Sequence, residues 1–96
     1  MHIVKRSGAT EAYDGSKIVA AIAGAFSDVN REASEETLAA LLRAAEESIA
    51  ATDARTVEAI QDIVERSLTE LNYYEVLKSF ILYRNERAKK REARRK

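Results

Sequence analysis

Positively charged side chains gather near the start of the chain, around a turn. Lys5 and Arg6 precede a Ser-Gly pair that is typical of turns, and Lys17 falls in the first turn of the helix that we expect next. A helix N-terminus has outward-pointing N–H groups and a positive dipole, so a lysine beside it completes an anion site. Lysine binds phosphate as a point charge, and arginine binds it with two hydrogen bonds. These cations therefore predict a phosphate-binding site.

Acidic and hydroxyl side chains lie among these cations. Glu11, Asp14 and Ser16 stand between the turn and Lys17. The carboxylates can accept hydrogen bonds from a base amine or a sugar hydroxyl, or hold Mg²⁺ together with phosphates. The alternative is a set of surface ion pairs, each contributing about 0–1 kcal/mol. Residue types and spacing alone leave both interpretations open.

Missing residue types exclude other chemistry. The 96 residues include no Cys, and the single histidine is His2. A thiolate zinc site, a disulfide framework, a cysteine nucleophile and a Ser-His-Asp triad are therefore excluded in this chain. The glycine-rich phosphate motifs G-x-G-x-x-G and G-x-x-x-x-G-K-[ST] are also missing. We predict no catalytic residue and no metal site built from protein side chains alone, so the chain is not expected to be an enzyme by itself.

The charged cluster needs a hairpin and a helix to position it. Residues 3–6 and 10–13 are short strand-like runs on either side of the turn at residues 7–9, which predicts a β-hairpin. A two-stranded hairpin is only marginally stable alone, so it must pack on the rest of the chain.

Four later segments have apolar residues at helical spacing. Asp14 or Ser16 is expected to cap the first, Ser34 begins the second, and Asn72 ends the third in a left-handed conformation. Their apolar residues are Ile18, Ile22 and Phe26; Leu38, Leu41, Leu42, Ala45 and Ile49; Ile60, Ile63, Val64, Leu68 and Leu71; and Tyr73, Val76, Leu77, Phe80 and Ile81.

The link at residues 55–58 has some strand character. We expect a short strand near Thr56, to which Val57 would contribute, to join the hairpin. The predicted fold is therefore α+β and mostly helical. It is a four-helix bundle capped by a small three-stranded sheet, which consists of the hairpin and this short strand.

Charge is distributed unevenly although its total is zero. Residues 1–83 carry 8 basic and 14 acidic side chains, whereas residues 84–96 carry 8 basic and 2 acidic ones. A basic tail is typical of nucleic-acid binding. It also suits the C-terminal end of a helix, where the dipole is negative, or a helix that runs on into another domain. The apolar face ends near Ala88, so the tail should project from the body.

Length and hydropathy set the class of protein. Ninety-six residues allow one domain of ordinary size. The apolar runs are far shorter than the roughly 20 residues that a membrane-spanning helix needs, and residues 1–6 lack a secretory signal. We therefore expect a cytoplasmic domain without a membrane partner.

Two separated motifs resemble the ATP-cone domain. The first is Val4-Lys5-Arg6-Ser7-Gly8 with Glu11-x-Tyr13-Asp14-x-Ser16-Lys17-Ile18; the second is Ile60-Gln61-Asp62-x-Val64-Glu65-x-x-Leu68 with Tyr73-Tyr74-Glu75-Val76 and Ile81-Leu82-Tyr83-Arg84-x-x-Arg87. The resemblance runs from about residue 2 to residue 90. Ser7 stands where the family usually has Asp, and Asn72 where it often has Gly, but neither departure removes a ligand contact.

The resemblance implies a regulatory function. ATP-cones are nucleotide-binding domains, typically at the N-terminus of the large catalytic subunit of ribonucleotide reductases. ATP favours the active enzyme and dATP inhibits it, through a change in subunit assembly. The implied architecture is four helices with a small mixed three-stranded sheet. The implied partners are ATP or dATP with Mg²⁺, the reductase catalytic domain in the same chain, and the other reductase subunit.

The resemblance also implies binding residues and boundaries. The nucleotide would be bound by Lys5, Arg6, Glu11, Ala12, Tyr13, Asp14, Gly15, Ser16, Lys17, Ile18, Thr56, Gln61 and Arg87. Residues 1–90 would form the cone, and residues 91–96 a basic helical extension leading into a catalytic domain. The family also includes a transcriptional repressor with a zinc ribbon, which needs cysteines that this chain lacks. A nucleic-acid-binding module that uses the basic tail remains the alternative function.

Overall fold

Polar side chains fix where the first three helices begin. The computed structural model describes residues 1–5 and 7–94, with side chains described up to residue 86. Asp14 caps α1 (Gly15–Asp28), Ser34 caps α2 (Glu35–Thr52) and Thr56 caps α3 (Val57–Glu70). Each side-chain oxygen accepts a hydrogen bond from a backbone N–H in the first turn, at 3.0 to 3.1 Å. The predicted cap at Ser34 is confirmed, and Asp14 caps the first helix rather than Ser16.

Left-handed residues mark where helices end. Asp53 ends α2 with a φ of 56°, and Asn72 has a φ of 63° between α3 and α4 (Tyr74–Arg94). Asn and Asp tolerate this region better than other residues with side chains, because they can hydrogen-bond locally. The predicted conformation of Asn72 is therefore confirmed.

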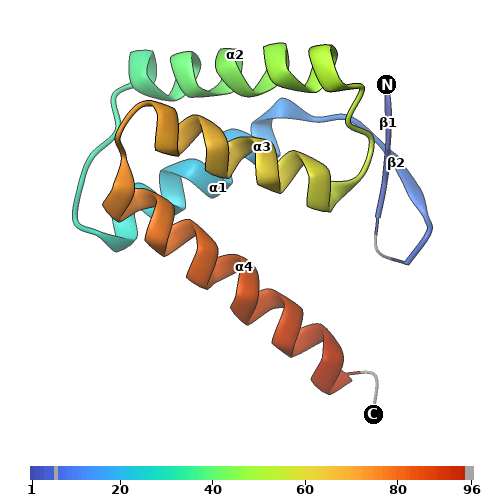
Figure 1. The fold of residues 1–96 in the computed structure, drawn as a ribbon. Helices are drawn as coiled ribbons and strands as arrows, with labels where there is room; N and C mark the ends of the chain where they lie inside the picture. The colour runs from blue at the N-terminus through green and yellow to red at the C-terminus, as the bar shows by residue number, and fades with distance from the viewer. Residues whose placement is uncertain (6, 95–96) are drawn as a thin grey trace.

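The apolar faces of the helices form one core. Helix α1 packs against α2 and α4, and α3 packs against α2 and α4, so each helix has two neighbours in the bundle (Figure 1). The most deeply buried large side chains come one from each helix; they are Ile22, Leu41, Leu68 and Val76. The predicted bundle of four helices is confirmed, and these buried side chains form its core.

An antiparallel hairpin closes one end of the bundle. Strands β1 (His2–Val4) and β2 (Thr10–Ala12) pair so that Ile3 lies opposite Glu11. The turn needs Gly8, whose φ is 87°, and the amide of Lys5 donates to the carbonyl of Ala9 at 2.8 Å. Ile3 is 4% exposed and joins the core. This one apolar side chain of the hairpin attaches it to the helices.

The prediction of a third strand is wrong. Among the described residues the sheet has two strands, and the link contributes only an isolated parallel bridge between Val4 and Thr56. The amide of Val4 donates to the carbonyl of Arg55 at 2.7 Å. The next residues cannot continue the pairing, because Thr56 caps α3 and Val57 is already its first residue. The start of α3 at Val57 therefore prevents a third strand from forming in this link.

The last helix leaves the bundle. Figure 1 shows the C-terminal half of α4 running away from the other three helices, as expected from the loss of apolar residues near Ala88. Side chains from residue 87 onward, and Arg6, lie outside the described residues. None of the described helices has both the length and the apolar composition needed to cross a membrane.

Candidate functional site

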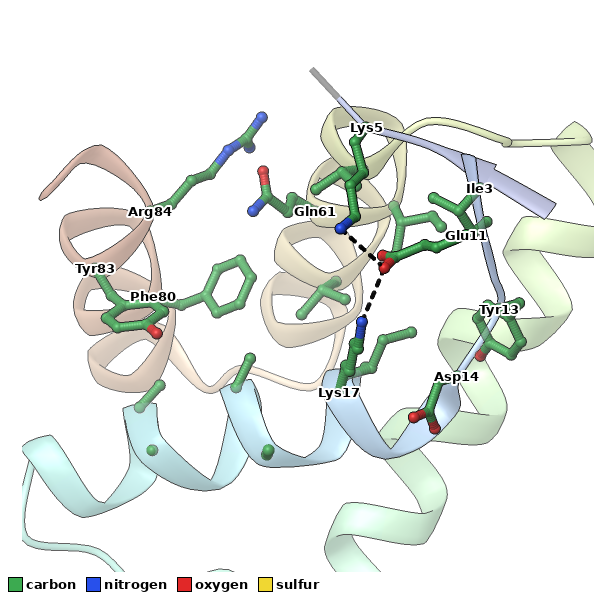
Figure 2. A pocket seen from close by; sticks show the side chains of 18 of the residues that line it. Ile3, Lys5, Glu11, Tyr13, Asp14, Lys17, Gln61, Phe80, Tyr83 and Arg84 are labelled. Atoms are coloured by element: carbon green, nitrogen blue, oxygen red, sulfur yellow. Dashed lines mark hydrogen bonds and ion pairs between the residues drawn. The ribbon is translucent and has the colours of Figure 1, made fainter. Parts of the chain in front are cut away.

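A cavity of about 690 Å³ opens between the hairpin, α1, α3 and α4 (Figure 2). Its size falls in the range of small-molecule sites, roughly 300 to 1,000 Å³. The hairpin and the following loop contribute Ile3, Lys5, Glu11, Ala12, Tyr13 and Asp14; α1 contributes Lys17, Ile18, Ala20, Ala21, Gly24, Ala25 and Asp28; α3 contributes Val57, Ile60, Gln61 and Val64; and α4 contributes Phe80, Tyr83 and Arg84. Polar groups lie at its rim around an apolar interior.

Two ammonium groups meet at the hairpin side of the cavity. Lys5 follows β1 and Lys17 lies in the first turn of α1, yet both contact Oε2 of Glu11, at 3.3 Å and 3.0 Å. Figure 2 shows these contacts as the two dashed lines. The hydrogen bond from Lys17 lowers the pKa of Glu11 below its ordinary value, and Lys5 adds to this effect. These three side chains together carry one net positive charge, and the carboxylates of Asp14 and Asp28 also belong to the cavity lining.

Asp14 serves the helix as well as the cavity. Its Oδ1 accepts hydrogen bonds from the hydroxyl of Ser16 at 2.7 Å and from the Ser16 amide at 3.0 Å. These bonds lower the pKa of Asp14. The capping carboxylate therefore stays ionised at the mouth of α1, and the Ser16 hydroxyl is committed to it.

The loop between β2 and α1 is tied to α2. The hydroxyl of Tyr13 donates to Oε2 of Glu46 at 2.7 Å, and burial raises the pKa of Tyr13 above its ordinary value. A Cβ on Gly15 would lie 3.4 Å from the Tyr13 hydroxyl, from Glu46 and from Leu42. The start of α1 therefore lies against α2 at about van der Waals distance, and the hydrogen bond from Tyr13 to Glu46 holds the preceding loop there.

A third cation lies on the opposite side. Nη1 of Arg84 contacts Asp62 at 2.8 Å and Glu65 at 2.7 Å, and so joins α4 to α3. Its side chain is 19% exposed, and Figure 2 shows it beside Gln61 on the wall facing Lys5. Arg84 was not among the residues expected to bind the nucleotide. The signal for it is its position four residues after Phe80, which places a cation on the buried face of α4.

Small residues of α1 make room inside the cavity. Ala20, Ala21, Gly24 and Ala25 line it, and a Cβ built on Gly24 would meet nothing within 4 Å. Phe80 forms the apolar side across from them. The cavity lining therefore combines apolar side chains with charged side chains of both signs.

The structure brings together most of the predicted site residues. Lys5, Glu11, Ala12, Tyr13, Asp14, Lys17, Ile18 and Gln61 line the cavity, whereas Gly15, Ser16 and Thr56 lie outside its lining. Thr56 caps α3, and Ser16 is bonded to Asp14. The side chains of Arg6 and Arg87 lie outside the described residues. No group of three His, Cys, Asp or Glu side chains suited to a metal ion occurs among the described residues.

Residues 1–89 match the family model of the ATP cone domain. The chain therefore belongs to the ATP cone domain family, as its two motifs predicted. It is 41% identical over 102 residues to the ribonucleoside-diphosphate reductase subunit alpha of Treponema pallidum (strain Nichols), an alignment that covers 98% of this chain and 12% of that protein.

Two further relatives carry the same name. The Chlamydia pneumoniae protein is 37% identical over 98 residues, covering 93% of this chain and 9% of that protein; the Chlamydia muridarum (strain MoPn / Nigg) protein is 32% identical over 105 residues, covering 98% and 10%. The chain spans about a tenth of the length of these relatives. None of these comparisons supports the nucleic-acid alternative.

Proposed function

We propose that this domain binds ATP or dATP in the cavity and thereby regulates a ribonucleoside-diphosphate reductase. The observation that carries the proposal is the convergence of Lys5 and Lys17, from two different elements, at one edge of an apolar cavity. Membership of the ATP cone domain family and the names of the three relatives support this function.

In this proposal the polyphosphate lies at the hairpin side and the adenine ring lies deeper. Lys5 and Lys17 contact the phosphates, and the N-terminus of α1 adds its dipole. The ring packs near Ile18 and the small residues of α1, which line the apolar part of the cavity. Gln61 lies on the opposite wall, where it is placed to contact the ribose or the base. Arg6 and Arg87 are proposed as additional phosphate contacts, and Mg²⁺ would bind with the phosphates.

Regulation requires that two ligands favour different states of the domain. ATP and dATP differ by one 2′-hydroxyl, so only a contact that responds to this group can produce opposite effects. A hydrogen bond made or lost at that hydroxyl is worth about 0.5–1.5 kcal/mol, which is enough to shift an equilibrium several-fold. We propose that this shift changes the surface offered to the catalytic domain in the same chain and to the other reductase subunit.

Calorimetric titration of the chain with ATP and with dATP tests the proposal. We expect both nucleotides to bind, and Lys17→Ala to weaken both by about tenfold or more, since a charge-assisted phosphate contact is worth about 1.5–3 kcal/mol. Lys78→Ala is the matched control, because Lys78 is an exposed lysine of α4 outside the cavity lining. No binding at millimolar nucleotide, or equal losses in the two variants, would contradict the proposal.

A further inference from the structure

The two lysines at the cavity already share an anion. Lys5 and Lys17 contact the same atom, Oε2 of Glu11, at 3.3 Å and 3.0 Å. A single oxygen between two ammonium groups has the geometry that a phosphate oxygen adopts between two lysines. The protein's own carboxylate thus lies between the two ammonium groups (Figure 2).

Strand pairing explains why this carboxylate points inward. Residues directly opposite each other in an antiparallel pair lie on the same face of the sheet, and Glu11 is opposite Ile3. Ile3 is buried in the core, so the face that carries Glu11 is the one turned toward the helices. The neighbours Thr10 and Ala12 are more exposed than Glu11, as expected of side chains that alternate along a strand. Inward-facing positions are usually apolar, because burying a carboxylate is unfavourable. A carboxylate at this position therefore points to a function for its charge.

The charges around Glu11 limit what it does for the fold. The side chains of Lys5 and Lys17 are 50% and 64% exposed, and water screens such pairs strongly. Lys5 and Lys17 share the single carboxylate of Glu11, and Lys17 also lies near the carboxylate of Asp14. A ligand with several negative charges can satisfy both lysines better than Glu11 does, so the carboxylate is exchangeable.

We propose that the Glu11 carboxylate is an internal stand-in for ligand phosphate, which occupies Lys5 and Lys17 until a polyphosphate displaces it. This inference rests on the proposed function. Glu11 then sets the affinity of the site, because every bound polyphosphate must first break the two contacts to Oε2. Displacement also releases β2 from α1, since the bond between Glu11 and Lys17 joins these elements.

Inorganic tripolyphosphate tests this inference without any contribution from base or ribose. Calorimetric titration would compare the wild-type chain, Glu11→Gln and Glu47→Gln. Glu47 is the matched control, because it loses the same charge from an exposed position on α2 outside the cavity. We expect Glu11→Gln to bind about three to ten times more tightly than wild type, a range typical of losing one or two partly exposed ion pairs. Glu47→Gln should bind as wild type does.

The salt dependence of tripolyphosphate binding gives a second test with the same variants. The local charge rises by one when Glu11 is neutralised, so tripolyphosphate binding should weaken more steeply with added salt in Glu11→Gln than in wild type. Equal or weaker tripolyphosphate binding by Glu11→Gln, or no detectable binding by either protein, would overturn the stand-in role. If the wild-type chain binds neither ATP nor dATP, the proposed function fails instead, which is a distinguishable result.

A measurement on the wild-type chain covers the case in which Glu11→Gln does not fold. The ¹³C resonance of the Glu11 carboxyl group reports its ionisation and its contacts. We expect this resonance to move when tripolyphosphate saturates the site, while that of Glu47 stays in place. A Glu11 resonance that does not move at saturation would overturn the proposal, because the carboxylate would then have kept its two lysines.

Discussion

The hairpin and the α3–α4 wall face each other across one cavity but are held in different ways. The hairpin is attached by one buried side chain, Ile3, by one backbone bond to Arg55 and by exposed lysine contacts to Glu11. The α3–α4 wall includes core residues of both helices and an arginine 19% exposed. We therefore expect the hairpin to be the wall that moves more easily if the proposed ligand binds.

The two walls also differ in charge. On the hairpin side two cations share one carboxylate, whereas on the other side Arg84 faces the two carboxylates of Asp62 and Glu65. The first group has one net positive charge and is the proposed phosphate site, while the second has one net negative charge and joins α3 to α4.

The largest effect should come from removing the attachment of the hairpin. Ile3→Ala is expected to lower the free energy of unfolding by about 2–4 kcal/mol, since a buried Ile loses its transfer free energy and leaves a cavity. Amide hydrogen exchange should quicken mainly in β1 and β2, in contrast to Leu68→Ala, which should quicken exchange in all four helices. Uniform loss of protection in Ile3→Ala would show that the hairpin is not a separate unit.

A smaller effect is expected on the opposite wall. Arg84→Met removes the cation between Asp62 and Glu65, and should lower the free energy of unfolding by about 1–2 kcal/mol, because two carboxylates then face each other without a counter-ion. Urea denaturation measures the change, and Arg66→Met, an exposed position on α3, is the control. A loss no larger than that of Arg66→Met would remove the distinction between the two walls.

The smallest effect is expected from acid. The pKa values of Glu11 and Asp14 are lowered from ordinary values of 4.5 and 3.8. Groups with a depressed pKa in the folded state stabilise it above their unfolded pKa, so this contribution is lost as the pH falls below about 4.5. Urea midpoints between about pH 3 and pH 6 measure the loss. Glu11→Gln should flatten part of this dependence relative to Glu47→Gln; equal slopes in both variants would contradict the assignment.

The sequence predicts the helical part of the fold well, because local signals and packing agree there. The apolar spacing of each helix matches its buried face except at Leu71, which follows the end of α3, and at Ile81; both are exposed. The caps at Asp14 and Ser34 lie where their types predict. The link near Thr56 is different, because β-branched residues favour a strand while Thr at that position also caps a helix. Tertiary context decides between the two, and the cap prevails after a single bridge to Val4.

The sequence predicts which residue types form the candidate site, but it does not predict which of their side chains contact one another. Lys5, Glu11 and Lys17 all appear in the motifs, yet only the strand register shows that one carboxylate oxygen joins both lysines. For Arg84 the sequence gives two conflicting signals. Its place near a run of basic residues suggests a solvated tail, whereas its spacing from Phe80 turns it toward the cavity.

The hydrogen bond from Tyr13 to Glu46 has a consequence for α2. Among the residues that the structure describes, none from α2 lines the cavity. The helix is nevertheless hydrogen-bonded to the loop that does line it. A displacement of this loop would therefore be transmitted through the hydrogen bond to the middle of α2, outside the cavity lining. The hydrogen bond from the Tyr13 hydroxyl to Glu46 therefore links the edge of the cavity to a helix that does not line it.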